Sequence, residues 1–457
     1  MQLEGTRNTN PSGIFAQVAR GEGNTGRAGN VTIKTRELTL NAGAQISSST
    51  FRNGDGATID INASDFITLT GSRPGATRRG GSSGIFATAE AGETTGKPGT
   101  LNIVTGQLTV ENDGKISVNN RGTGQTPGSL TLNVNKLVIR NGGTVEAGTF
   151  NTGPGGILRV NATDSVEVSG TGILGESTIT TQAESSGKAG ELIIDTSLLR
   201  VKDDANVTVS STGTGTAGNL TVTADRIELD NKGKLIGETR TGADAGNITL
   251  NLKESLFLRR QSQISTSAGT AEAPGNGGNI SINAPNGFVV AIPKENSDIT
   301  ANAFTGNGGN VKIESQGIFG IERRNQLTDE SDITVSSLFG VAGNINLTNP
   351  ENDGIQNSLT ELPQNRINSE TLVASSCVVR GNERNGTFFI TGSGGLPYRP
   401  GDAVPSAYPT GDVQPVAGDT STTKPTRRWK IGDPLIEPTG VYRLANGQRI
   451  LSRECGR

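Results

Sequence analysis

The sequence contains no histidine, and this absence removes a large part of enzyme chemistry. Without an imidazole the chain cannot form a Ser-His-Asp triad, a histidine metal site or a histidine acid-base pair. The only two cysteines, Cys377 and Cys455, both lie near the C-terminus, so a disulfide framework and a zinc cluster are excluded. One bridge between these two cysteines stays open as an alternative to two free thiols.

Aromatic residues and long apolar runs are also scarce. Phe, Tyr and Trp make up 4% of the chain, and Trp429 is the single tryptophan. No stretch approaches the roughly 18 apolar residues of a membrane-spanning helix, so we expect a chain that does not span a membrane. The net charge of -3 offers no basic surface, so we also expect no nucleic-acid partner.

Glycine is abundant, with 65 residues, and it recurs in a phrase that starts with glycine and continues apolar, polar, apolar. The phrase opens at Gly29, Gly99, Gly128, Gly190, Gly218, Gly246, Gly278, Gly309 and Gly343, with weaker copies at Ala57 and Gly156. The commonest spacing is 28 residues, and the longest, 42, carries the glycine-rich stretch 72–84, "SRPGATRRGGSSG", which we interpret as a loop. A fixed period of this length indicates a solenoid.

Each repeat contains three short runs of alternating apolar and polar residues. In the repeat that starts at Gly218 these are "NLTVTA", "RIELDN" and "KLIGET". Alternation of this kind puts one set of side chains on one face of a strand. Because one repeat alone cannot bury that face, we predict that the repeats coil and stack into a parallel β-helix of about eleven three-stranded coils.

Glycine and asparagine mark the predicted corners between strands. Glycine adopts left-handed backbone angles freely and asparagine next best, so we expect a left-handed corner at phrase glycines such as Gly246. Asparagine follows the glycine at Asn30, Asn219, Asn247, Asn279, Asn310 and Asn344. We expect these amides to stack as a ladder along the coils.

The repeats predict a domain of residues 1–349, and the tail has three parts. Residues 350–396 form a cap or strand segment with Cys377, and residues 397–438 form a proline-rich linker. Residues 439–457 contain "GVYRLANGQRILS", which is typical of a hairpin around Asn446-Gly447.

These residues resemble a known family. The "GNVTI" repeats, the "SGIFA" returns at Ser12 and Ser83, and above all "LVASSCVVRGNERNGTFFITGSGGLPYRPGDAV" at 372–404 look like cyanobacterial exoproteins of the filamentous haemagglutinin type. The resemblance covers essentially the whole chain and implies a right-handed parallel β-helix, secretion by the two-partner route through an Omp85-type outer-membrane transporter, and an extracellular or outer cell-surface location. The family's N-terminal signal peptide and secretion domain have no counterpart here, so we expect the chain to be a fragment, the C-terminal part of such a protein.

The function that follows is an adhesin-like structural protein without catalytic activity, which mediates adhesion, aggregation or cell contact through an unknown cell-surface or carbohydrate ligand. The alternative is a carbohydrate-active β-helix enzyme, since this fold also hosts lyases and hydrolases. Its candidate carboxylates are Asp203 and Asp204 and the cluster Asp329, Glu330 and Asp332, which are more typical of solvated loop or strand positions. The motif 53–61, "NGDGATIDI", lacks the successive repeats of a calcium-binding roll. We therefore expect no cofactor and assign no catalytic, cofactor-binding or metal-binding residue.

Overall fold

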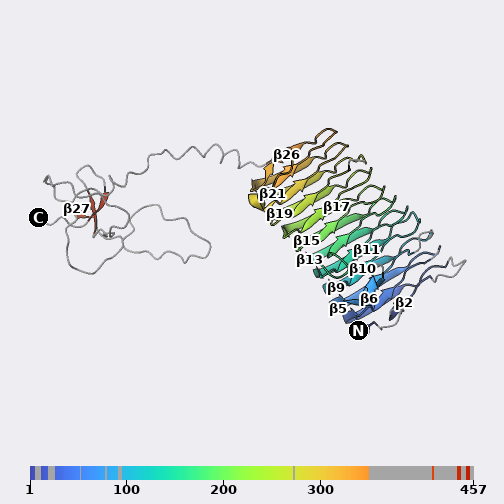
Figure 1. Ribbon diagram of the computed structural model, residues 1–457. Coiled ribbons are helices and arrows are strands. Elements are labelled where there is room, and N and C mark those ends of the chain that lie inside the picture. Colours follow the sequence, from blue (N-terminus) through green and yellow to red (C-terminus); the bar gives the residue numbers. More distant parts are fainter. Residues whose placement is uncertain are drawn as a thin grey trace. The chain divides into compact units, whose positions relative to one another are not determined.

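Alternating apolar and polar residues form two parallel sheets that run the length of the repeats. The computed structural model describes residues 1–5, 12–18, 26–51, 53–77, 80–90, 95–270 and 273–348, together with 414–415, 440–443 and 449–452. The chain divides into two compact units, Met1–Ile355 and Gln356–Arg457. The first is a parallel β-solenoid, as predicted, and its stacking is compatible with a right-handed coil (Figure 1).

The long-strand sheet holds one strand of each coil in chain order. Its strands are β1 (Gln2–Glu4), β3 (Val31–Asn41), β5 (Thr58–Thr70), β9 (Thr100–Glu111), β11 (Ser129–Arg140), β13 (Ile157–Ser169), β15 (Glu191–Lys202), β17 (Leu220–Asp230), β19 (Ile248–Leu258), β21 (Ile280–Ala291), β23 (Val311–Phe319) and β26 (Ile345–Thr348).

The short-strand sheet contains β2 (Gly13–Phe15), β4 (Gln45–Ser47), β8 (Gly84–Phe86), β10 (Lys115–Ser117), β12 (Thr144–Glu146), β14 (Thr178–Thr180), β16 (Asn206–Thr208), β18 (Lys234–Ile236), β20 (Gln263–Ser265), β22 (Asp298–Thr300), β25 (Asp332–Thr334) and β24 (Glu322–Arg323). After each short strand a single bridging residue pairs with its counterpart in the next coil, in a third row that runs from Val18 to Ser337. Within the described residues eleven coils contribute a strand to each sheet and a bridging residue, including the first, in which β1 has only three residues.

The first two runs of each repeat form one bent strand where we predicted two. In β17 the buried residues are Leu220, Val222 and Ala224, and then Ile227 and Leu229, so two consecutive residues face outward at the bend. The pairing of β17 with β19 shifts by one residue at this point. The strand continues through the predicted turn "DR" because a change in side-chain phase bends the backbone without interrupting its hydrogen bonds.

The core is a stack of matching apolar layers. Leu192, Leu220, Ile248, Ile280 and Val311 occupy equivalent positions on successive long strands and are almost completely buried. Each coil therefore covers the apolar side chains of the coil before it, which is how a thin repeat with few aromatics obtains a core.

The left-handed corners lie between the long and the short strand, and the expectation at Gly246 is wrong. Asn231 and Lys232, with φ of 43° and 64°, form such a corner, which the Gly233 N–H closes by donating to the Asp230 carbonyl at 2.9 Å. Gly246 does not have a positive φ. Glycine is required at position 246 because a Cβ atom there would lie 1.8 Å from the Gly218 carbonyl oxygen of the preceding coil.

The predicted asparagine ladder is confirmed from Asn219 to Asn344, whereas Asn30 meets no asparagine in the next coil and its Oδ1 accepts from the Thr58 backbone N–H at 3.1 Å. The Asn247 Nδ2 donates to the Asn219 Oδ1 at 3.0 Å, and the Asn279 Nδ2 donates to the Asn247 Oδ1 at 3.2 Å. The Asn310 Nδ2 repeats the contact with Asn279 at 3.0 Å, and the backbone N–H of Asn344 donates to the Asn310 Oδ1 at 3.0 Å. These amides connect five successive coils along one edge of the solenoid.

Outside the two sheets the described part of the chain adds small elements. The expected loop in the 42-residue interval contains a two-stranded hairpin, β6 (Ser72–Thr77) with β7 (Gly80–Ser82), and one short 3-10 helix, η1, spans Pro293–Glu295. In the second unit β28 (Gly440–Arg443) pairs antiparallel with β29 (Arg449–Ser452), as a hairpin requires, and β27 (Gln414–Pro415) pairs with β28. Cys377, Trp429, Cys455 and the predicted turn Asn446-Gly447 lie outside the described residues.

Candidate functional site

A row of buried and half-buried polar side chains follows the side of the short-strand sheet that faces away from the apolar core. The middle residue of each short strand points into the core, so the third residue and the residue two positions later face outward. The hydroxyl and amide residues at these positions form the polar row: Gln17, Ser47, Ser49, Thr88, Ser117, Asn119, Thr180, Gln182, Thr208, Ser210, Ser265, Ser267, Thr300, Asn302, Thr334 and Ser336. Phe15, Phe86, Glu146, Gly148, Ile236 and Glu238 interrupt it. Thr208 Oγ1 donates to Ser210 Oγ at 2.8 Å, and Thr300 Oγ1 donates to Ser265 Oγ of the preceding coil at 2.8 Å. Hydrogen bonds thus link this row both within and between coils.

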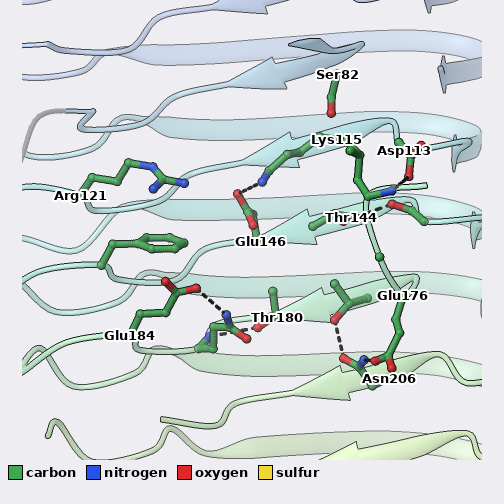
Figure 2. Close-up of a pocket in the computed structure, with 16 residues that line it drawn as sticks. Ser82, Asp113, Lys115, Arg121, Thr144, Glu146, Glu176, Thr180, Glu184 and Asn206 are labelled. Carbon is green, nitrogen blue, oxygen red and sulfur yellow. Dashed lines mark hydrogen bonds and ion pairs between the residues drawn. The ribbon is translucent and has the colours of Figure 1, made fainter. Parts of the chain in front are cut away.

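In the coils of β10, β12, β14 and β16 the polar row widens into a hollow of about 700 Å³. Its floor consists of side chains from the short strands, among them Lys115, Thr144, Glu146, Thr178 and Thr180. Figure 2 shows Arg121 and Glu184 on one side of this floor and Asp113, Glu176 and Asn206 on the other. The hollow therefore spans several coils along the stack.

An insertion in the coil of β13 and β14 builds one wall of the hollow. Eight residues, 170–177, separate these two strands, whereas three separate β17 from β18. The insertion forms a tight turn in which the Gly172 N–H donates to the Gly175 carbonyl at 2.7 Å. The Leu174 N–H then donates to the Asp113 Oδ1 at 3.0 Å, a contact between residues 61 apart. The turn is thereby tied to a corner two coils earlier.

The opposite side of the hollow holds an aromatic residue and a cation. The Arg121 guanidinium lies 3.9 Å from the centre of the Phe150 ring, a cation–π contact between neighbouring coils. The same guanidinium is 3.7 Å from the carboxylate of Glu90. Arg121 is therefore held by partners on its own side of the hollow.

Carboxylates outnumber cations in this hollow. Lys115 Nζ lies 2.6 Å from the Glu146 carboxylate, which is 7% exposed. Glu176 accepts a hydrogen bond from Asn206 Nδ2 at 2.6 Å, and Glu184 accepts one from Gln182 Nε2 at 3.0 Å. Neither exposed glutamate has an ion-pair partner among the described residues, so the hollow keeps negative charge.

The structure places Asp203 and Asp204 in a corner and not on a strand. Their φ angles of 58° and 64° are left-handed, and both follow the end of β15. The Asn231 Nδ2 of the next coil donates to the Asp203 Oδ1 at 2.9 Å, while Lys232 Nζ lies 3.7 Å from Asp204. The pair takes part in coil stacking and lies outside the hollow.

The second predicted cluster is divided by the fold. Glu330 and Asp332 converge on the Arg324 guanidinium, whose Nη1 is 2.5 Å from an Asp332 carboxylate oxygen and whose Nη2 contacts Glu330. Asp332 is completely buried. Asp329 lies apart from them, in a separate small hollow beside Arg260 and Lys294. The guanidinium therefore acts as an electrostatic clamp at β24 and β25.

Sequence reasoning missed Asp298, which neighbours this clamp. Burial raises the pKa of the Asp298 carboxyl to about 6; the hydrogen bond from the Asp332 N–H at 2.9 Å opposes the rise, and the charge of Asp332 adds to it. No sequence signal distinguishes Asp298 from the other acidic residues that start a short strand, because only stacking brings it against Asp332.

In the described ranges no three acidic side chains are grouped as a metal site requires. No described helix is long and apolar enough to cross a membrane. The chain was also compared with known proteins, and no protein family, curated protein or solved structure matches it.

Proposed function

We propose that the chain is a secreted or cell-surface, filamentous adhesin-like structural protein that mediates adhesion, aggregation or cell contact. The supporting observation is the repetition of half-buried polar side chains at one position of six successive coils, Gln182, Ser210, Glu238, Ser267, Asn302 and Ser336, above hydroxyls such as those of Ser265 and Thr300 that are buried. Many weak contacts on one rigid body combine into a strong attachment because every contact after the first is intramolecular.

The proposal includes export of the full-length protein through an Omp85-type outer-membrane transporter. A parallel solenoid suits such a route, since each coil pairs only with its neighbours and coils can form one after another. The asparagine ladder and the stacked apolar layers give each arriving coil a template.

Protease treatment of intact host cells tests this proposal. An antibody against residues 200–350 should lose its signal from intact cells, or detect the chain in the medium, while a cytoplasmic marker stays protected. Protection of the chain until the cells are lysed would contradict a surface or secreted location.

A carbohydrate-active enzyme is the second candidate, because four carboxylates, Asp113, Glu146, Glu176 and Glu184, line one hollow. Glycoside hydrolysis uses a pair of carboxyl groups, one as acid and one as base or nucleophile. Incubation of the full chain with polysaccharides and measurement of new reducing ends tests this candidate. Sustained turnover that disappears in Glu146→Gln would replace the adhesin proposal with an enzymatic one.

A further inference from the structure

The hollow has the chemistry of a glycan-binding site. Sugar hydroxyls both donate and accept hydrogen bonds, and they pair best with planar amides, carboxylates and hydroxyls. Gln182, Asn206 and Thr178 supply these groups from adjacent coils, and all three line the hollow. Phe150 and Leu174 add apolar carbon at opposite sides, where the C–H face of a sugar ring can pack.

The direction of the hollow selects an extended ligand. Neighbouring strands in a sheet lie about 4.8 Å apart, which is close to the length of one pyranose unit in an extended chain. A glycan that lies along the stack from β10 to β16 therefore places about one sugar on each coil, and the sugar over β14 lies between Glu176 and Glu184. The insertion 170–177 and the Arg121–Phe150 pair confine it on both sides.

The charge of the hollow selects among glycans. Lys115 is paired with Glu146, and Arg121 is held by Glu90 and Phe150, so neither cation is free to receive an anionic sugar. Glu176 and Glu184 lie on opposite sides of β14, are exposed, and accept hydrogen bonds from neutral amides. A ligand that lies between these two glutamates binds most tightly if it carries amino groups that are protonated at neutral pH, because these form charge-assisted hydrogen bonds with the carboxylates.

We propose that this hollow binds a glycan chain with free amino groups, such as an oligomer of glucosamine. The proposal rests on the adhesin-like function above and names the ligand class and the surface that binds it. The insertion is part of the site, since Leu174 and Glu176 both belong to it.

Titration calorimetry with the full chain tests this inference. We expect binding of a glucosamine hexamer, and an approximately tenfold weaker affinity for each of the variants Glu176→Gln and Glu184→Gln, which keep an acceptor oxygen but remove the charge. Glu191→Gln is the matched control, because Glu191 is an exposed carboxylate at the start of β15 on the other sheet. It should bind like the wild type.

Two further ligands separate charge from sugar recognition. An N-acetylglucosamine hexamer lacks the amino charge, and hexalysine has the charge without the sugar; both should bind at least tenfold more weakly than the glucosamine hexamer. No binding of that hexamer, equal binding of either comparison ligand, or an equal effect of Glu191→Gln would overturn the inference. Attachment of cells to the chain is measured separately: attachment that persists without glycan binding leaves the adhesin proposal standing and rejects only this site.

Discussion

Replacing Gly246 with alanine tests the steric reason for the phrase glycines. A Cβ atom at this position would lie 1.8 Å from the Gly218 carbonyl oxygen, whereas real Cβ contacts essentially never fall under 3.0 Å. The two coils must therefore separate locally by about 1.2 Å, the difference between these distances. Hydrogen bonds hold the backbone in place on both sides, from the Gly246 N–H to Gly237 at 2.8 Å and from the Ile248 N–H to Asn279 at 2.9 Å.

The expected loss follows from these contacts. Overpacking of a closely packed interior costs about 1–3 kcal/mol, and a buried backbone group that loses its partner costs about 1–3 kcal/mol. With one such group lost we expect Gly246→Ala to lower the free energy of unfolding by about 4 kcal/mol. At roughly 2 °C for each kcal/mol in a large domain, the midpoint of thermal unfolding falls by roughly 8 °C.

Two matched variants separate sterics from backbone conformation in the same melting assay, followed by circular dichroism. Gly71→Ala enters a left-handed position, φ 76°, where the nearest atom is 3.8 Å away, so it should cost only the strain of that conformation, about 1–2 kcal/mol. Gly26→Ala meets no atom within 4 Å and should be neutral. A Gly246→Ala chain that melts like the wild type, or no lower than Gly71→Ala, would refute the steric argument.

Three further predictions concern charges and the ladder. The Asp298 carboxyl has a pKa of about 6 in the folded chain, whereas an unfolded Asp has a pKa near 4. The free energy of unfolding should therefore fall by about 1 kcal/mol as pH rises from about 4 to above 6, after allowance for the partial exposure of Asp298. Chemical denaturation of Asp298→Asn should no longer show this fall with pH, and a pH profile like that of the wild type would contradict the prediction. Arg324→Met should lower the midpoint of chemical denaturation by leaving the buried Asp332 carboxylate without its cation, and an unchanged midpoint in the same assay would argue against the clamp. Asn279→Ala removes the ladder contacts with both neighbouring coils and should lower the free energy of unfolding by about 1–2 kcal/mol. Hydrogen exchange of the Asn310 backbone amide, which donates to the Asn279 Oδ1, should become faster, and unchanged protection would count against the ladder.

The sequence predicts this fold well because the governing interactions are local and repeated. The alternation in "NLTVTADRIELD" identifies the inward side chains of β17, and the recurrence of asparagine after glycine predicts the ladder. The bend in each long strand escaped prediction because a change of phase and a chain reversal have similar sequence patterns. The role of Gly246 escaped it because a glycine required by a neighbouring coil looks the same as one required by its own φ.

The hollow is less accessible to sequence reasoning. The spacing of 34 residues from Gly156 to Gly190 indicates an insertion, but its turn acquires a role only through the hydrogen bond from Leu174 to Asp113. Similarly, Glu330 and Asp332 appear as a simple acidic run until Arg324 folds between them. In both cases the stacking of the coils determines which residue makes the contact, Asp113 in the first and Arg324 in the second, and the repeat pattern of the sequence does not reveal it.

The match of one coil to the next also bears on how the length of such a chain changes in evolution. Removal of residues 219–246, one period of 28, would join Gly218 directly to Asn247 and bring Leu192 opposite Ile248, an apolar residue facing an apolar residue. The core would close over the gap, the ladder would start at Asn247 in place of Asn219, and the hollow, whose lining residues all precede residue 207, would be left in place. Unequal recombination between repeats can thus shorten or lengthen the solenoid by whole coils while the proposed glycan site is inherited unchanged.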